Sequence, residues 1–268
     1  MRKTSGLLSA ALALGLSAAL QAAPLSDVSE IVDRANLASY YAGDDGRSEA
    51  RMKIEDAQGR TQLRQFTILR NDHADGGDQD FMVFFSRPSD VRGTVFLVHK
   101  HVDSDDDRWL YLPGLDLVRR ISPGDKRTSF VGSHFFYEDV SGRHPQDDEH
   151  RLVETTDTHY VLESTPRKPG EVEFERFVTQ VDRETFLPMK TEYYDDQDRV
   201  YRVMEVLEVE DIEGEPTVTR SRMSTPLDGG GTLMEFRYIE YDVGLPGDIF
   251  SERYLRNPPI DWLRREQD

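Results

Sequence analysis

The 268-residue sequence contains no cysteine, so it can form no disulfide and cannot carry a lipid on an N-terminal cysteine. A chain without disulfides depends on its hydrophobic core for stability. Basic residues are also scarce, 33 against 51 acidic residues, which gives a net charge of -18. Nucleic acid is therefore a poor partner, because its phosphate backbone is itself negative. Long apolar runs are missing except at residues 7–20, which are too few to span a bilayer, so we expect no membrane-spanning segment.

The N-terminal residues have the pattern of a secretory signal peptide. A basic start, Met1-Arg2-Lys3, precedes the apolar run, and small residues follow at Gln21-Ala22-Ala23. We predict a signal peptide over residues 1–22, cleaved after Ala22, and one domain over residues 23–268. Without Arg2 and Lys3, 31 basic residues face 51 acidic ones, a net charge of -20. A mature chain of this size buries roughly 70–75% of its unfolded surface, which is sufficient for a stable core.

Most of the mature sequence reads as consecutive strands separated by turns. An amphipathic helix comes first, capped by Asp27 and running to about Leu37. Strands follow at residues 47–56, 60–71, 80–86, 93–101 and 108–121, and a second set lies between residues 151 and 241. Because short turns join successive strands, we predict an antiparallel meander and not an alternation of strands and helices.

One stretch, beginning at Asp107, carries a family resemblance. It reads DRWLYLP, then VRRI, a basic loop containing K, SF and GS, and finally FFYED. Trp109 and Tyr111 share one face of a strand while Leu110 and Leu112 share the other, so both faces are apolar. These motifs resemble the outer membrane lipoprotein-sorting protein family, the LolA-like group. The resemblance implies a mainly β fold: a curved, open antiparallel sheet, or half-barrel, whose concave face is covered by a few accessory helices and holds acyl chains.

Aromatic side chains gather in and just after the strands that are apolar on both faces. As candidates for lining an apolar, ligand-binding groove we select the following residues: Phe84, Phe96, Trp109, Tyr111, Phe130, Phe135, Phe136 and Tyr137. Ordinary core packing is the alternative for each of them.

Two other chemistries are weaker interpretations. His99 and His101 have the spacing of two metal ligands on a strand, but two ligands are not a site, and a solvated hairpin tip explains them as well. Ser133-His134 beside Glu138 and Asp139 contains the residue types of a hydrolase, without the glycine-flanked serine elbow, and fits a helix start better. We therefore predict no metal, no cofactor and no enzymatic activity.

These features together predict a periplasmic carrier that shields the acyl chains of a lipid or lipoprotein during transport toward the outer membrane. The resemblance implies action beside an inner-membrane transporter. The alternative is a periplasmic sensor or adaptor on the same scaffold, which binds a lipid or protein signal. Burial of acyl methylenes at about 0.8 kcal/mol each would supply the affinity in the carrier.

Overall fold

The computed structural model describes residues 24–263, which form one antiparallel sheet of thirteen strands with short helices on its faces. The helices are α1 (Val28–Tyr40), α2 (Tyr137–Ser141), α3 (Arg253–Arg256) and α4 (Ile260–Leu263). The strands are β1 (Asp45–Glu55), β2 (Thr61–Asp72), β3 (Gln79–Arg87), β4 (Val95–Lys100), β5 (Asp107–Leu112), β6 (Leu117–Ile121), β7 (Asp148–Thr155), β8 (His159–Pro166), β9 (Arg176–Asp182), β10 (Pro188–Tyr194), β11 (Val200–Ile212), β12 (Glu215–Ser224) and β13 (Gly231–Tyr241).

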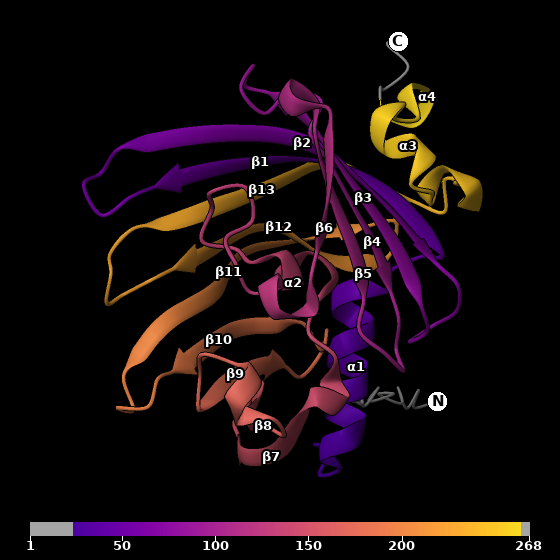
Figure 1. The fold of residues 1–268 in the computed structure, drawn as a ribbon. Helices are drawn as coiled ribbons and strands as arrows, with labels where there is room; N and C mark the ends of the chain where they lie inside the picture. Colours follow the sequence, from indigo (N-terminus) through magenta and orange to yellow (C-terminus); the bar gives the residue numbers. More distant parts are fainter. Residues whose placement is uncertain (1–23, 264–268) are drawn as a thin grey trace, which may run out of the picture.

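The strand order shows an open, curved sheet (Figure 1). β1 lies near the middle, with β2 to β6 following on one side and β13 back to β7 on the other. β6 and β7 are the two edges, and they do not pair with each other in the described chain. The predicted half-barrel with a few accessory helices is therefore confirmed. The predicted signal peptide, residues 1–22, lies outside the described residues.

The connection between the two halves of the sheet crosses its concave face. β6 ends at Ile121 on one edge and β7 begins at Asp148 on the other, so residues 122–147, here the crossover segment, must span the opening. Figure 1 shows α2, within this segment, in front of the sheet. We call the face beneath it the inner face and the opposite face the outer face. α2 begins at Tyr137, so Ser133, predicted to start a helix, lies in the preceding turn.

Helix α1 covers the inner face near β8 and β9. The carboxylate of Asp27 accepts hydrogen bonds from the backbone N–H groups of Ser29 and Glu30, at 2.9 and 3.4 Å, as the capping pattern predicts. Ile31 and Ala35, one turn apart, are buried in a cluster with Tyr160, Leu162 and Val181 of these strands.

The outer face of β2 to β5 is covered by the C-terminal residues. Leu69, Met82 and Leu97 have no exposed surface and pack in a cluster with Phe250 and Leu255. The buried carboxylate of Asp45 holds the segment that leads there, accepting from the backbone N–H groups of Val243 at 2.7 Å and Leu245 at 2.6 Å. This cover explains why the middle strands are apolar on both faces.

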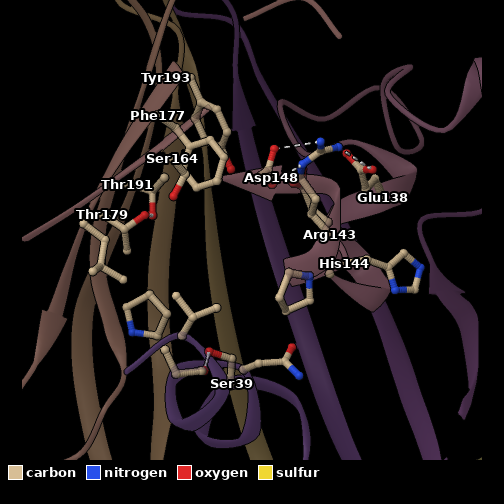
Figure 2. A pocket seen from close by; sticks show the side chains of 18 of the residues that line it. Ser39, Glu138, Arg143, His144, Asp148, Ser164, Phe177, Thr179, Thr191 and Tyr193 are labelled. Atoms are coloured by element: carbon tan, nitrogen blue, oxygen red, sulfur yellow. Dashed lines mark hydrogen bonds and ion pairs between the residues drawn. The ribbon is translucent and has the colours of Figure 1, made fainter. Parts of the chain in front are cut away.

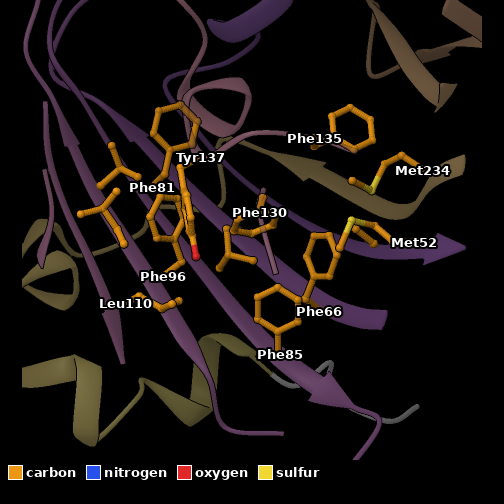
Figure 3. Packing of buried hydrophobic residues seen from close by; sticks show 14 of the residues in the cluster. Met52, Phe66, Phe81, Phe85, Phe96, Leu110, Phe130, Phe135, Tyr137 and Met234 are labelled. Carbon is orange, nitrogen blue, oxygen red and sulfur yellow. The ribbon is translucent and has the colours of Figure 1, made fainter. Parts of the chain in front are cut away.

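The inner face of β1 to β6 carries the main hydrophobic cluster, which Figure 3 shows. Phe130 of the crossover segment is 2% exposed and lies at its centre. Its ring centroid is 5.4 to 6.5 Å from those of four aromatic neighbours: Phe66, Phe85, Phe96 and Tyr137. The crossover segment is thus part of the core of this half of the sheet.

A buried polar network fastens the end of the crossover segment to β4 and β5. The Nζ of Lys100 donates to the backbone carbonyl of Ser141 at 2.7 Å, and His144 contacts the carboxylate of Asp106 at 2.9 Å. Asp106 also accepts from the hydroxyl of Ser141 at 3.2 Å and pairs with Arg108. Burial lowers the pKa of Lys100 to about 8.

No helix among residues 24–263 has the length and apolar character needed to cross a bilayer.

Candidate functional site

A cavity of about 430 Å³ opens between the inner face and the helices that cover it. The end of α1, the crossover segment and strands from both halves of the sheet form its wall. Its apolar lining includes the following residues: Phe66, Ile68, Phe81, Val83, Phe130, Phe135, Val140, Met204, Val206, Met223, Met234, Phe236 and Ile239. This volume lies within the range of small-molecule sites, and the lining suits an apolar ligand.

Several apolar side chains of this larger cavity are only half-buried. Ile68, Met204, Val206 and Phe236 keep part of their surface accessible although they lie on the inner face. Apolar surface that stays uncovered inside a hollow costs free energy in water, which an apolar ligand would recover by covering it.

A smaller cavity of about 190 Å³ adjoins the larger one (Figure 2). The two share part of their lining, the residues Ser39, Tyr40, Asp139, Pro188, Thr191 and Tyr193. The charged groups that line the smaller cavity are Arg127, Arg143, Arg202, Glu138, Asp139 and Asp148, with His144 and His150 beside them. The concave side therefore has two adjoining cavities, and the smaller one has more charged residues for its size, beside apolar residues such as Phe174 and Val181.

Ion pairs hold the charged groups in place. The Nε and Nη2 of Arg143 donate to the two carboxylate oxygens of Asp148 at 2.7 and 2.9 Å, a bidentate pair that Figure 2 shows. Although burial opposes it, the cations of Lys126, Arg143 and Arg127 lower the pKa of Glu138. Burial raises the pKa of Asp148, and Arg143 offsets only part of that rise.

Arg202 of β11 fastens α2 to the opposite half of the sheet. Its guanidinium pairs with the carboxylate of Asp139 and lies 4.0 Å from the ring centroid of Phe136 and 5.2 Å from that of Tyr193. The Arg202 side chain is 4% exposed. A cation between two rings and a carboxylate is well held, which fixes the boundary between the two cavities.

Five of the predicted groove residues lie on the concave side. Phe130 and Phe135 line the larger cavity, and Phe136 lines the smaller one. Phe96 and Tyr137 belong to the inner cluster and pack around Phe130, with ring centroids 5.4 and 5.5 Å from it. Their binding roles remain predictions.

The other three predicted residues lie on the outer face, which corrects that part of the prediction. Phe84, Trp109 and Tyr111 pack against the cluster formed with the C-terminal residues, and none of them lines either cavity. The ring of Trp109 lies edge-on to His99, 5.1 Å between centroids. The alternation along β5 was correct, but the side chain on the inner face is Leu110 and not Trp109.

The sequence analysis missed the part of the site that comes from β10 to β13. Met204 and Val206 are separated by Glu205 on β11, and Met234 and Phe236 are separated by Glu235 on β13. This period of two was a usable signal for one lined face. It could not show that these strands lie opposite Phe66, because the pairing of β1 with β13 joins residues almost 200 positions apart.

The residues considered for metal binding and hydrolysis are engaged separately. His99 contacts the backbone carbonyl of Phe250 at 2.6 Å, whereas His101 lies 3.2 Å from Asp78. Among residues 24–263, no three His, Asp or Glu side chains are grouped to hold a metal ion. His134 contacts the hydroxyl of Thr232 at 2.9 Å, while the hydroxyl of Ser133 bonds within its own turn, so the two do not form a nucleophile and base pair.

Two comparisons support the fold without assigning a role. A LolA superfamily protein from Nitrosomonas europaea has 21% sequence identity and a TM-score of 0.66, over 85% of this chain and 98% of that one. A domain from Vibrio parahaemolyticus, described as a candidate outer membrane lipoprotein-sorting protein, has 25% identity and a TM-score of 0.77, over 85% and 98%. A search of curated proteins finds no match.

Two further matches show the family. A family model described as an uncharacterized protein matches residues 77–257, more than half of the chain. A DUF1329 family protein from Desulfovibrio piger is 33% identical, with a TM-score of 0.77, over 84% of this chain and 96% of that one. The open sheet, the crossover segment and these similarities together show that the chain belongs to the DUF1329 family, built on the LolA-like fold.

Proposed function

We propose that this protein is a periplasmic carrier that shields the acyl chains of a lipid or lipoprotein in the larger cavity. The observation that carries the proposal is the cavity itself: about 430 Å³, apolar, and bounded by half-buried side chains on the concave face of the sheet. No reaction is required for this role, because transfer depends only on binding and release.

The hydrophobic effect supplies enough free energy for such binding. Each acyl methylene removed from water contributes about 0.8 kcal/mol, so twelve methylenes contribute about 10 kcal/mol. Association costs roughly 4–15 kcal/mol in lost freedom, so one covered chain binds reversibly. Reversible binding is what a carrier needs at both ends of its path.

Two features support the proposed location in the periplasm and transport toward the outer membrane. The predicted signal peptide would direct the chain across the inner membrane, and one structural relative is described as a candidate for sorting lipoproteins to the outer membrane. We place the protein beside an inner-membrane transporter that loads it. The acidic surface, with 51 acidic residues, would shorten its stay on anionic membranes after delivery.

The test is to express the full chain with its own leader, purify it from the periplasm without detergent, and analyse it by native mass spectrometry and an organic extract. We expect a chain beginning at Ala23 with about one equivalent of bound lipid. Val206→Trp, which places a large ring in the larger cavity, should lower lipid occupancy at least fivefold.

Leu207→Trp is the matched control, since Leu207 is the next residue on β11, is 40% exposed and does not line the cavity. Its lipid occupancy should equal that of the wild type. Lipid-free wild-type protein that co-purifies with a protein partner would instead support a sensor or adaptor. Equal lipid occupancy in the two tryptophan variants would place the lipid elsewhere.

A further inference from the structure

The smaller cavity adjoins the larger one and is lined by equal numbers of arginines and carboxylates. Three arginines, Arg127, Arg143 and Arg202, and three carboxylates, Glu138, Asp139 and Asp148, line it. Most of these side chains are less than a tenth exposed, so their charges are largely desolvated. A ligand group with a single net charge would leave one sign unmatched in such a place, which is costly. A group that carries both signs fits the balance.

The guanidinium group of Arg202, at this cavity, has one N–H donor without a hydrogen-bond partner in the part of the chain that the structure describes. The Nε of Arg202 is buried and has no hydrogen-bond partner within residues 24–263, although the Nη2 of the same side chain is engaged by Asp139. Most buried polar groups in proteins are hydrogen-bonded, so an unused donor on an arginine that lines the cavity points to an acceptor on a ligand. A phosphate oxygen is the acceptor that arginine suits best.

Two tyrosines line the region that the two cavities share. Tyr40 of α1 and Tyr193 of β10 line both cavities, and neither hydroxyl forms a hydrogen bond within the described residues. Burial raises the pKa of both phenols, so they remain neutral hydrogen-bond donors at physiological pH. Ester carbonyl groups, which join acyl chains to glycerol, would accept hydrogen bonds at this boundary.

We propose that the two cavities together bind a glycerophospholipid with a zwitterionic, amine-bearing headgroup, such as phosphatidylethanolamine. The two acyl chains enter the larger cavity, the ester groups meet Tyr40 and Tyr193, and the headgroup occupies the smaller cavity with its phosphate toward Arg202. The amine faces the carboxylates of Glu138 and Asp148. This inference rests on the proposed function, since it requires the larger cavity to hold acyl chains.

The experiment measures lipid competition by native mass spectrometry on the full mature chain. Phosphatidylethanolamine, phosphatidylglycerol and diacylglycerol with identical acyl chains are offered in equal amounts, and hexadecanol is offered separately as a chain without a phospholipid headgroup. We expect phosphatidylethanolamine to exceed each of the other two at least fivefold. The double variant Tyr40→Phe, Tyr193→Phe should lower its affinity about tenfold, the effect of one or two lost hydrogen bonds, and change hexadecanol binding less than twofold.

Tyr111→Phe is the control, because it removes the same group from the outer face. It should leave every affinity unchanged, and all three proteins should melt at similar temperatures. Equal binding of phosphatidylglycerol or diacylglycerol, or no effect of the double variant, would overturn the headgroup assignment while leaving the carrier proposal intact. Failure of the wild type to bind even hexadecanol would overturn both.

Discussion

Phe130→Ala is the substitution that tests most directly whether the crossover segment is part of the core. The Phe130 side chain is 2% exposed and contacts aromatic rings from β2, β3 and β4 as well as Tyr137 of α2. Removing a buried phenylalanine ring costs about 3–5 kcal/mol, through lost burial and the space left behind. For a protein of this size, each kcal/mol lowers the melting temperature by about 2–4 °C. We therefore expect a fall of roughly 6–20 °C.

The assay is thermal and urea unfolding followed by circular dichroism on the mature protein. Leu115→Ala is the control, because Leu115 is 73% exposed, and it should change the free energy of unfolding by less than about 0.5 kcal/mol. A loss below about 1 kcal/mol for Phe130→Ala would refute the reasoning. It would mean that the crossover segment rests on the sheet without belonging to its cooperative core.

Two further predictions concern a buried carboxylate and a close backbone contact. Burial raises the pKa of Asp72, whose Oδ2 has no hydrogen-bond partner in the described chain, to about 6, whereas the unfolded residue titrates near pH 4. The folded state therefore binds more protons between these values, and the free energy of unfolding should fall as pH rises from 4 to 6. Asp72→Asn should remove this pH dependence and raise the free energy of unfolding by about 2 kcal/mol at pH 7, with little difference at pH 4. If the free energy of unfolding of the variant falls with pH as in the wild type, Asp72 is not the group responsible. Gly142 has φ +79, and a Cβ at this position would lie 2.5 Å from the Tyr40 ring. Gly142→Ala should therefore lower the melting temperature by several degrees, whereas the control Gly170→Ala, where a Cβ meets no atom within 4 Å, should not change it. Equal melting temperatures for the two variants would show that α1 and the crossover segment are not in close contact.

The local features of the fold could be predicted because short-range physics decides them. Asp27 starts α1 through its own side chain, and Pro113-Gly114 turns β5 into β6 within a few residues. The period of two along β5 separates Trp109 from Leu110 on any model of the sheet. None of these inferences needs information about distant parts of the chain.

The sequence could not predict which face of the sheet forms the groove, because this depends on distant parts of the chain. Both sets of side chains on β3 to β5 are apolar, and the outer set is covered by residues near 245–263, which come more than 130 positions later in the chain. Sequence periodicity shows that both faces of a strand are covered. It does not show which face is packed tightly by other parts of the chain and which face borders a cavity. The pair between Asp139 and Arg202, 63 positions apart, sets the boundary of the two cavities and is equally invisible in the sequence.

The arrangement of the covers explains where a ligand can bind on this sheet. On the outer face, the C-terminal residues fill the space over Leu69, Met82 and Leu97, which have no exposed surface left. On the inner face, Phe130 fills the space over β2 to β4, but a cavity remains between the crossover segment and the rest of the sheet. The uncovered strip runs along β1, β13, β12 and β11, and the half-buried side chains of Met204 and Phe236 lie on it. Since covering an apolar strip of this kind is favourable in water, the part of the inner face that the crossover segment leaves open is where the proposed ligand would bind.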